Sequence, residues 1–186
     1  MPSSTVLFVQ GAGPGAHAAD QALASSLQTH LGSGYNVRYP QMPGEDDPDP
    51  AQWKARVAQE LSDVQGPLVL VAHSAGGPIL LKYLADEQAP AISGLVLIAP
   101  PFLGSGGWDW GGWSIDTLLA SNRFTSQVTG STPVFIHHSR DDQVVPFAHL
   151  QLYRARLPHA VIRVFDDRGH QFGNDLSEVA RDISSL

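Results

Sequence analysis

Short apolar segments alternate along the chain with longer segments in which apolar residues recur every three or four positions. The short segments are rich in Val, Leu and Ile and predict β-strands, whereas the longer ones predict amphipathic helices. The expected strands cover residues 5–9, 36–39, 68–72, 94–99, 134–138 and 161–165. The expected helices cover about 18–31, 50–64, 147–156 and 175–183, and a further helix follows the third strand and ends near residue 87.

This alternation indicates the fold class. Continuously apolar strands separated by helices are typical of a parallel sheet with helices on both faces. We therefore expect an α/β fold, a three-layer α/β/α sandwich with a mostly parallel sheet of about six strands. A Gly- and Trp-rich segment at about 100–125 interrupts the alternation and predicts a short cap-like insertion. Such sheets bind ligands at the carboxyl ends of their strands, so residues that follow the strands are the candidates for a site.

The composition limits the possible classes of protein. A chain of 186 residues has the size of one domain, so residues 1–186 are expected to form a single domain. Its content of 42% hydrophobic and 16% charged residues excludes a disordered chain. The net charge of −7, with only 11 scattered Lys and Arg, argues against a nucleic-acid partner. The absence of Cys excludes disulfides and thiolate chemistry.

The lengths of the apolar segments bear on the location of the protein. The longest of them, such as 67–72, are far shorter than the roughly 20 residues that a membrane-spanning helix needs. The first residues lack a basic segment and predict a strand rather than a signal peptide. We therefore expect a cytoplasmic protein without a membrane partner, and its oligomeric state stays open.

Three of the expected strands are followed by residues with reactive side chains. Ser74 follows the third strand, Asp141 and Asp142 follow the fifth, and His170 follows the sixth. A serine hydroxyl is a weak nucleophile near neutral pH and needs a base, which a histidine supplies. A buried aspartate fixes the tautomer of that histidine and stabilises its protonated form. The sequence therefore offers a nucleophile, a base and an acid, and either aspartate fits the last role.

The residues around the serine resemble the α/β-hydrolase family, in which the nucleophile lies in a G-x-S-x-G turn and the triad follows the order Ser, Asp, His. The turn here runs from Ala72 to Gly76, with Ala72 in place of the first glycine. The resemblance covers nearly the whole chain and extends to the small serine hydrolases that include the retinoblastoma-binding-protein-9-like group. It implies a catalytic triad of Ser74, Asp142 and His170.

The same resemblance distinguishes the two aspartates. Asp142 begins an Asp-x-x-Val-Pro stretch that ends at Pro146, and this stretch is similar to the acid loop of many family members. In that family the triad acid lies four residues before the proline. Asp141 is then expected to stabilise the turn by accepting hydrogen bonds from backbone N–H groups.

The segment Gly11–Ala16, after the first strand, fits the G-x-G-x-x-G/A fingerprint of dinucleotide-binding proteins. That fingerprint also requires an acidic residue at the end of the second strand, where this chain has Arg38 and Tyr39. The acids at 45–47 come later in the chain. We therefore expect no cofactor.

In the hydrolase resemblance this glycine-rich segment corresponds to the oxyanion loop. The resemblance implies that the backbone N–H groups of Ala12 and Ala75 stabilise the oxyanion. Gly11 and Gly13 are alternative donors. The other interpretation is a turn that merely needs glycine.

A cluster of His137, His138, Asp141 and Asp142 suggests a metal site. Adjacent residues of a strand point to opposite faces of the sheet, so only one of the two histidines could face a given site. We therefore expect no metal.

The segment at 100–125 is rich in aromatic residues. These residues either pack in the core or line a substrate pocket, and we favour the pocket because an insertion at this place shapes the substrate site in the family that the chain resembles. Apolar walls of this kind suit a small to medium acyl group. The candidate substrate-binding residues are Phe102, Trp108, Trp110 and Trp113.

The residues and the resemblance together predict a serine hydrolase that cleaves carboxylic esters of small molecules through an acyl-enzyme intermediate. A thioesterase or amidase would use the same triad. The alternative from another class is an interaction protein that keeps the fold while its triad is idle, since fold does not dictate function.

Overall fold

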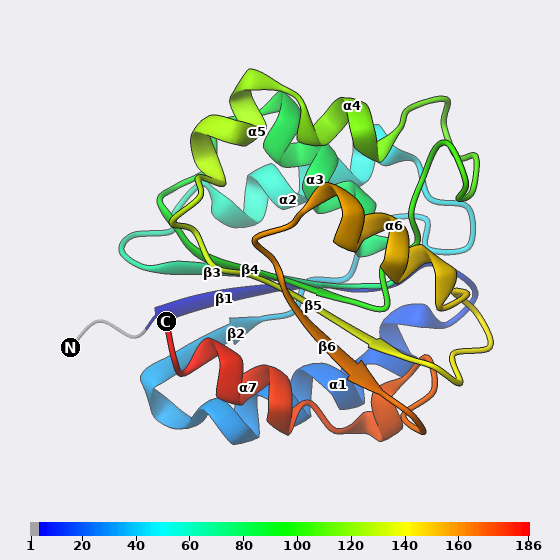
Figure 1. The fold of residues 1–186 in the computed structure, drawn as a ribbon. Coiled ribbons are helices and arrows are strands. Elements are labelled where there is room, and N and C mark those ends of the chain that lie inside the picture. Colours follow the sequence, from blue (N-terminus) through cyan, green and yellow to red (C-terminus); the bar gives the residue numbers. More distant parts are fainter. Residues whose placement is uncertain (1–3) are drawn as a thin grey trace.

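The computed structural model describes residues 4–186. Residues 1–3, part of the segment considered above for a signal peptide, lie outside the described residues. Six parallel strands form one sheet in the order β2-β1-β3-β4-β5-β6, which confirms the predicted fold class (Figure 1). The strands are β1 (Ser4–Val9), β2 (Tyr35–Arg38), β3 (Leu68–His73), β4 (Ile92–Ile98), β5 (Val134–Ser139) and β6 (Val161–Phe165).

Helices cover both faces of the sheet (Figure 1). Helices α1 (Ala16–Leu31) and α7 (Ser177–Ile183) lie on one face. The opposite face carries α2 (Pro50–Leu61), α3 (Gly76–Asp86), α4 (Ile115–Leu119), α5 (Asn122–Gln127) and α6 (Ala148–Arg156). Short 3₁₀ turns occur at η1 (Gly32–Gly34) and η2 (Phe172–Asn174). No helix within the described residues is long and apolar enough to cross a membrane.

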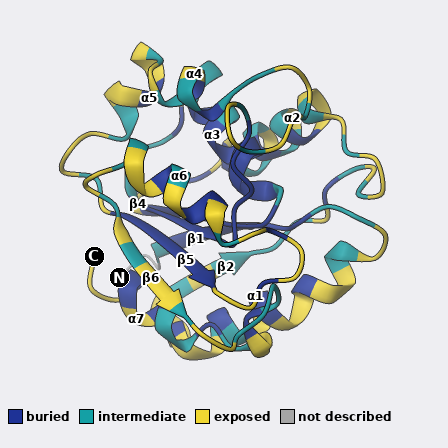
Figure 2. Ribbon diagram, turned by 45° about the vertical axis from the view of Figure 1, so that its right-hand side comes forward, coloured by how far each residue is buried: buried dark blue, intermediate teal, exposed yellow. Residues whose placement is uncertain are grey.

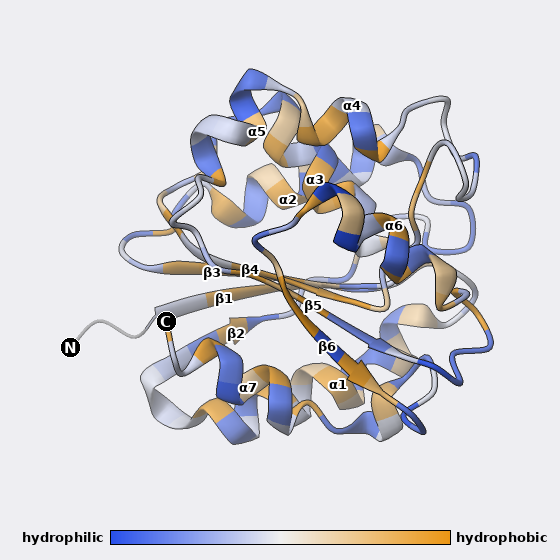
Figure 3. Ribbon diagram, in the orientation of Figure 1, coloured by the Kyte–Doolittle hydropathy of each residue, from blue (hydrophilic) through white to orange (hydrophobic). Residues whose placement is uncertain are grey.

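Alternate side chains of the strands enter two separate apolar layers, as the two-residue period of a strand requires. Leu7 and Val9 of β1 join the layer beneath α2 and α3, whereas Val6 and Phe8 join the layer beneath α1 and α7. Figure 3 shows apolar residues gathered in the sheet and on the helix surfaces that face it. These four side chains of β1 are completely buried, so the sheet packs against helices on both faces.

The two ends of the strand order differ from its centre. β6 forms an edge of the sheet and pairs only with β5. Its Val161 and Val164 are exposed, and Figure 2 shows this strand in the colours of exposed and intermediate residues beside the buried β5. The candidate site residues therefore follow both buried strands, β3 and β5, and this exposed edge strand.

The segment predicted as a cap-like insertion divides into two parts. Its first part, up to Trp113, is irregular and contains an isolated bridge between Leu103 and Trp108. Its second part forms α4 and α5, whose first turns are capped by the side chains of Ser114 and Ser121. Both short helices contact α3, so this part of the segment belongs to the helical layer between β4 and β5.

Candidate active site

Ser74 lies in a sharp turn between β3 and α3. Its φ of 50° is in the left-handed region, which a residue with a side chain rarely adopts. The turn is fixed by a hydrogen bond of 2.8 Å from the Ser74 N–H to the carbonyl oxygen of Ile98. Gly76 is needed there, because a Cβ at its position would lie 2.5 Å from the carbonyl oxygen of Gln10. The turn forms with Ala72 in place of the first glycine of the motif, and it raises Ser74 above the end of the sheet.

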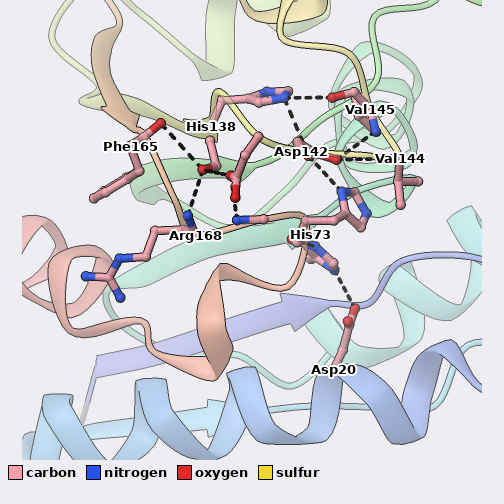
Figure 4. Close-up of polar contacts among 12 residues, drawn as sticks. Asp20, His73, His138, Asp142, Val144, Val145, Phe165 and Arg168 are labelled. Atoms are coloured by element: carbon pink, nitrogen blue, oxygen red, sulfur yellow. Dashed lines mark hydrogen bonds and ion pairs between the residues drawn. The ribbon is translucent and has the colours of Figure 1, made fainter.

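Asp142 and His170 meet beyond the ends of β5 and β6. The Nδ1–H of His170 donates to Oδ2 of Asp142 over 2.8 Å, and Oδ1 of Asp142 accepts from the N–H groups of Val144 and Val145 at 2.8 and 2.9 Å (Figure 4). Burial would raise the pKa of Asp142, but the His170 ring and the two N–H groups outweigh it and lower this pKa. The carboxylate therefore stays ionised and leaves Nε2 of His170 as the nitrogen available for proton transfer.

Ser74 and His170 line the same cavity of about 230 Å³. No hydrogen bond joins the Ser74 hydroxyl to another described residue. In free enzymes such bonds are often long and shorten when the substrate binds. The hydroxyl and the imidazole are thus brought to one cavity with the carboxylate behind the imidazole.

Asp141 takes a different position from its neighbour. Its Oδ1 accepts hydrogen bonds from the Ser139 hydroxyl at 2.5 Å and from the Gly169 N–H at 2.8 Å. These contacts connect the loop after β5 with the loop before His170. The structure therefore brings Asp142, and not Asp141, to the His170 ring.

The loop after β1 holds three candidate oxyanion donors, and two of them are already engaged. The N–H of Gly11 donates to Oδ2 of Asp20 at 2.8 Å, and the N–H of Gly13 donates to the carbonyl oxygen of Glu45 at 2.7 Å. The N–H of Ala12 has no acceptor among the described residues, and the same is true of the N–H of Ala75 at the start of α3. Ala12 and Ala75 also line one common cavity. Of the three loop candidates, Ala12 is the one with an unused N–H.

The sequence was compared with known families. It matches the serine hydrolase family over residues 16–175. The chain belongs to the serine hydrolase family. Comparison with curated proteins found no match. The finer resemblance to the retinoblastoma-binding-protein-9-like group stays a prediction.

Several solved structures share the fold of this serine hydrolase. The ydeN gene product from B. subtilis is 18% identical, with 98% of each chain covered and a TM-score of 0.73. The esterase domain of a Rhodothermus marinus protein is 18% identical, with 100% of this chain and 86% of that chain covered and a TM-score of 0.65. Est1E from Butyrivibrio proteoclasticus is 16% identical, with 98% and 86% covered and a TM-score of 0.66.

Glu45, which the sequence does not mark as a site residue, fixes the glycine-rich loop after β1. Its Oε2 accepts from the N–H of His17, in the first turn of α1, at 2.7 Å and from the side-chain amide of Gln10 at 2.8 Å. In a dinucleotide-binding protein the pyrophosphate occupies this amino end of the helix. A carboxylate at that place repels phosphate, so the surroundings of the loop, like the missing acid at the end of the second strand, differ from those of a dinucleotide site.

A second cavity, of about 320 Å³, is lined by Ala12 and Ala75, and Ala12 also lines the cavity that contains Ser74. Two of the predicted tryptophans, Trp108 and Trp110, form part of its wall. Trp108 packs edge-on against the His149 ring at 5.1 Å. The remaining lining residues are mainly apolar, with one carboxylate: Pro48, Pro101, Leu103 and Asp109.

The other two predicted aromatic residues are not brought to this cavity. Phe102 is completely buried and packs edge-on against Tyr153 of α6 at 5.2 Å. Trp113 packs against Trp110 at 5.9 Å and against the core, but it does not itself line the cavity. Phe102 and Trp113 therefore do not line this cavity, because both rings anchor the irregular segment to the helical layer. Their place in a substrate pocket stays a prediction.

The two adjacent histidines of β5 point to opposite faces, as the strand period requires. His138 donates from Nε2 to the carbonyl oxygen of Val145 at 3.0 Å, whereas His137 lies 3.1 Å from Asp182 of α7. Within residues 4–186 no group of three or more His, Asp or Glu residues is arranged to hold a metal ion.

Proposed function

We propose that the protein hydrolyses carboxylic esters through Ser74, His170 and Asp142. The observation that carries the proposal is the Asp142–His170 pair, which opens onto the same cavity as a serine held in a left-handed turn. Ser74 Oγ attacks the acyl carbon while Nε2 of His170 takes the hydroxyl proton. The protonated His170 then gives this proton to the leaving alcohol, which leaves an acyl group on Ser74.

Water completes the reaction in a second step. His170 Nε2 removes a proton from the water that attacks the acyl carbon, and it returns the proton to Ser74 as the acid product leaves. The N–H groups of Ala12 and Ala75 stabilise the negative oxygen that forms in each step, because fixed donors stabilise charge without reorganisation. The sequence of steps needs no cofactor and no metal.

The second cavity supports small to medium acyl groups as substrates. It adjoins both proposed oxyanion donors, so one substituent of a bound ester would enter it. Its walls are mainly apolar, with Trp108 as a partly exposed edge, 41% accessible. The names of two structural neighbours, an esterase domain and Est1E, agree with ester hydrolysis, although at 16–18% identity they indicate fold alone.

A catalytically idle interaction protein is the rival function. It would have no need of a strained turn at Ser74 or of a buried, ionised Asp142 that orients a histidine toward a cavity. Strain and shifted pKa values concentrate at functional sites, so these two features favour the enzyme.

A fluorophosphonate probe tests the proposed function. We expect covalent labelling of the wild-type protein and none of Ser74→Ala, which should lose turnover by a factor on the order of 10⁶. An ester panel graded from acetyl to palmitoyl should show an optimum at short to medium acyl chains, and matched thioesters and amides define the bond preference. Turnover by folded Ser74→Ala within about tenfold of wild type would refute the assignment.

A further inference from the structure

A second histidine–aspartate pair lies beside Ser74. His73, the last residue of β3, directs its ring to the face covered by α1, and its Nδ1 lies 2.8 Å from Oδ2 of Asp20 (Figure 4). Both side chains are buried, with 1% of each exposed. The ring centroid of His73 lies 4.7 Å from that of His170. The proposed mechanism gives neither Asp20 nor His73 a role.

The contacts of this pair reach three segments around the reacting atoms. Oδ2 of Asp20 also accepts from the N–H of Gly11 at 2.8 Å, which fixes the peptide next to Ala12. Nε2 of His73 lies 3.0 Å from the carbonyl oxygen of His170, so it holds the backbone of the histidine loop. His73 itself precedes Ser74 in the turn. The pair therefore connects the oxyanion loop, the nucleophile turn and the histidine loop.

The hydrogen-bonding partners keep the Asp20 carboxylate ionised. Nδ1 of His73 faces this carboxylate, and Nε2 faces the carbonyl oxygen of His170. Burial would raise the pKa of Asp20, but the bond and charge of His73 and the Gly11 N–H outweigh it and lower this pKa. The result is a buried, ionised carboxylate, and removal of His73 leaves it without its side-chain partner.

We propose that Asp20 and His73 form a positioning pair, which aims the Ala12 N–H at the oxyanion and the His170 ring at Ser74. This inference rests on the proposed function. The pair touches no reacting atom, so its effect is on geometry alone. A displacement of about 1 Å at an active site costs roughly 10²-fold in rate, and loss of one oxyanion donor costs about 10²–10³-fold.

The chain offers a matched control for a merely structural pair. His137 and Asp182 also form a buried histidine–aspartate contact, 3.1 Å long, on the same face of the sheet. Neither residue lines the cavity that contains Ser74 or the cavity that contains Trp108. Asp182→Asn therefore measures what loss of such a pair does to stability without a change at the site.

The test compares Asp20→Asn and His73→Phe with Asp182→Asn in ester turnover and in the rate of fluorophosphonate labelling. For the two variants of the positioning pair we expect kcat to fall about 10²-fold, KM to stay within about twofold, and labelling to slow in parallel with kcat. Asp182→Asn should keep the wild-type kcat while its thermal midpoint falls. A structural role alone would lower the thermal midpoint and leave kcat and KM unchanged at temperatures where the variant is folded.

Two conservative variants separate the two contacts of the His73 ring. The amide nitrogen of His73→Asn takes the place of Nδ1 and keeps the contact with Asp20, whereas that of His73→Gln takes the place of Nε2 and keeps the contact with His170. The kcat of each variant should be about tenfold higher than the kcat of His73→Phe. These variants also keep a polar group in the buried site, so they serve as the folded comparison if His73→Phe does not fold.

The outcomes distinguish the two proposals. If wild type turns over esters, Ser74→Ala does not, and Asp20→Asn and His73→Gln keep kcat within about threefold of wild type, the positioning pair is refuted and the proposed function stands. If Ser74→Ala retains labelling and turnover, the proposed function fails, whatever the pair variants do. A fall in kcat in Asp182→Asn as large as the fall in Asp20→Asn would also refute the positioning role of Asp20 and His73. It would show that loss of any buried charge lowers kcat.

Discussion

Consecutive histidines on β5 approach carboxylates on opposite faces of the sheet. On the face that carries α6, His138 lies 3.5 Å from Asp142 and donates to the carbonyl oxygen of Val145. On the face that carries α7, His137 lies 3.1 Å from Asp182. Burial lowers the pKa of both histidines, so both rings are neutral near pH 7. The difference between the two faces therefore lies in what else binds each carboxylate.

The two carboxylates have different further partners. Asp182 binds the Arg163 guanidinium through two contacts of 3.1 and 2.6 Å, so its charge is neutralised within the fold. Among the described residues Asp142 has no guanidinium partner, and it instead accepts from two backbone N–H groups and from the ring of His170. That ring opens onto the Ser74 cavity. The comparison teaches that a buried aspartate near a histidine is a candidate for catalysis when its other partner is a ring that opens onto a cavity. An aspartate whose other partner is a fixed cation is not.

The largest expected difference between the two faces is in kcat, when the carboxylate on each face is replaced by an amide. Asp142→Asn should lower kcat by roughly 10⁴, because the amide favours the wrong tautomer of His170 while preserving the shape of the site. Asp182→Asn should leave kcat within about twofold. Steady-state turnover of one ester by both folded variants provides the measurement. Similar losses in the two variants would remove the distinction between the faces.

The candidate-site half of this comparison, around Asp142, could be predicted from the sequence. Ser74, Asp142 and His170 each follow a strand, and parallel strands bring their carboxyl ends to one edge of the sheet. Two helices, α4 and α5, were not predicted although Ser114 and Ser121 stand as capping residues before them. Their short lengths give too few apolar positions for a period to be recognised.

Other contacts depend on the three-dimensional packing and have no local signal. Asp20 and His73 are 53 positions apart, and they meet only because α1 packs across the end of β3. Phe102 belongs to the core because it lies directly against α6, which an aromatic-rich segment alone does not reveal. Likewise, β6 is apolar apart from Arg163, but its position at the sheet edge leaves Val161 and Val164 exposed.

The next effect is a pH dependence of stability that arises from Asp182, on the face of the sheet that carries α7. Burial would raise the pKa of Asp182, but His137 and Arg163 outweigh it and lower this pKa from 3.8 to about 2. Because the pKa of Asp182 is lower in the folded state than in the unfolded chain, the ionised carboxylate stabilises the folded state at a pH above about 4. This stabilisation amounts to about 2 kcal/mol and is lost as the pH falls from about 4 to 2. The difference in unfolding free energy between wild type and Asp182→Asn, from urea titrations, should shrink across that range. A difference that stays constant from pH 6 to 2 would contradict the ion-pair role of Asp182.

The smallest expected effect separates Asp141 from Asp142, its neighbour in the loop after β5. Asp141 binds Ser139 and Gly169, so it supports the histidine loop from outside the His170 ring. Both hydrogen bonds end at Oδ1 of Asp141, and the side-chain oxygen of an asparagine can accept both of them. Asp141→Asn should therefore lower kcat by less than about tenfold and leave KM unchanged. Asp141→Ala removes this acceptor and should lower kcat further, through a looser loop at Gly169. Both variants are measured beside Asp142→Asn on the same ester. A loss for folded Asp141→Asn that exceeds the loss for Asp142→Asn would move the acid by one residue and show that the hydrogen bond from His170 to Asp142 does not orient the base.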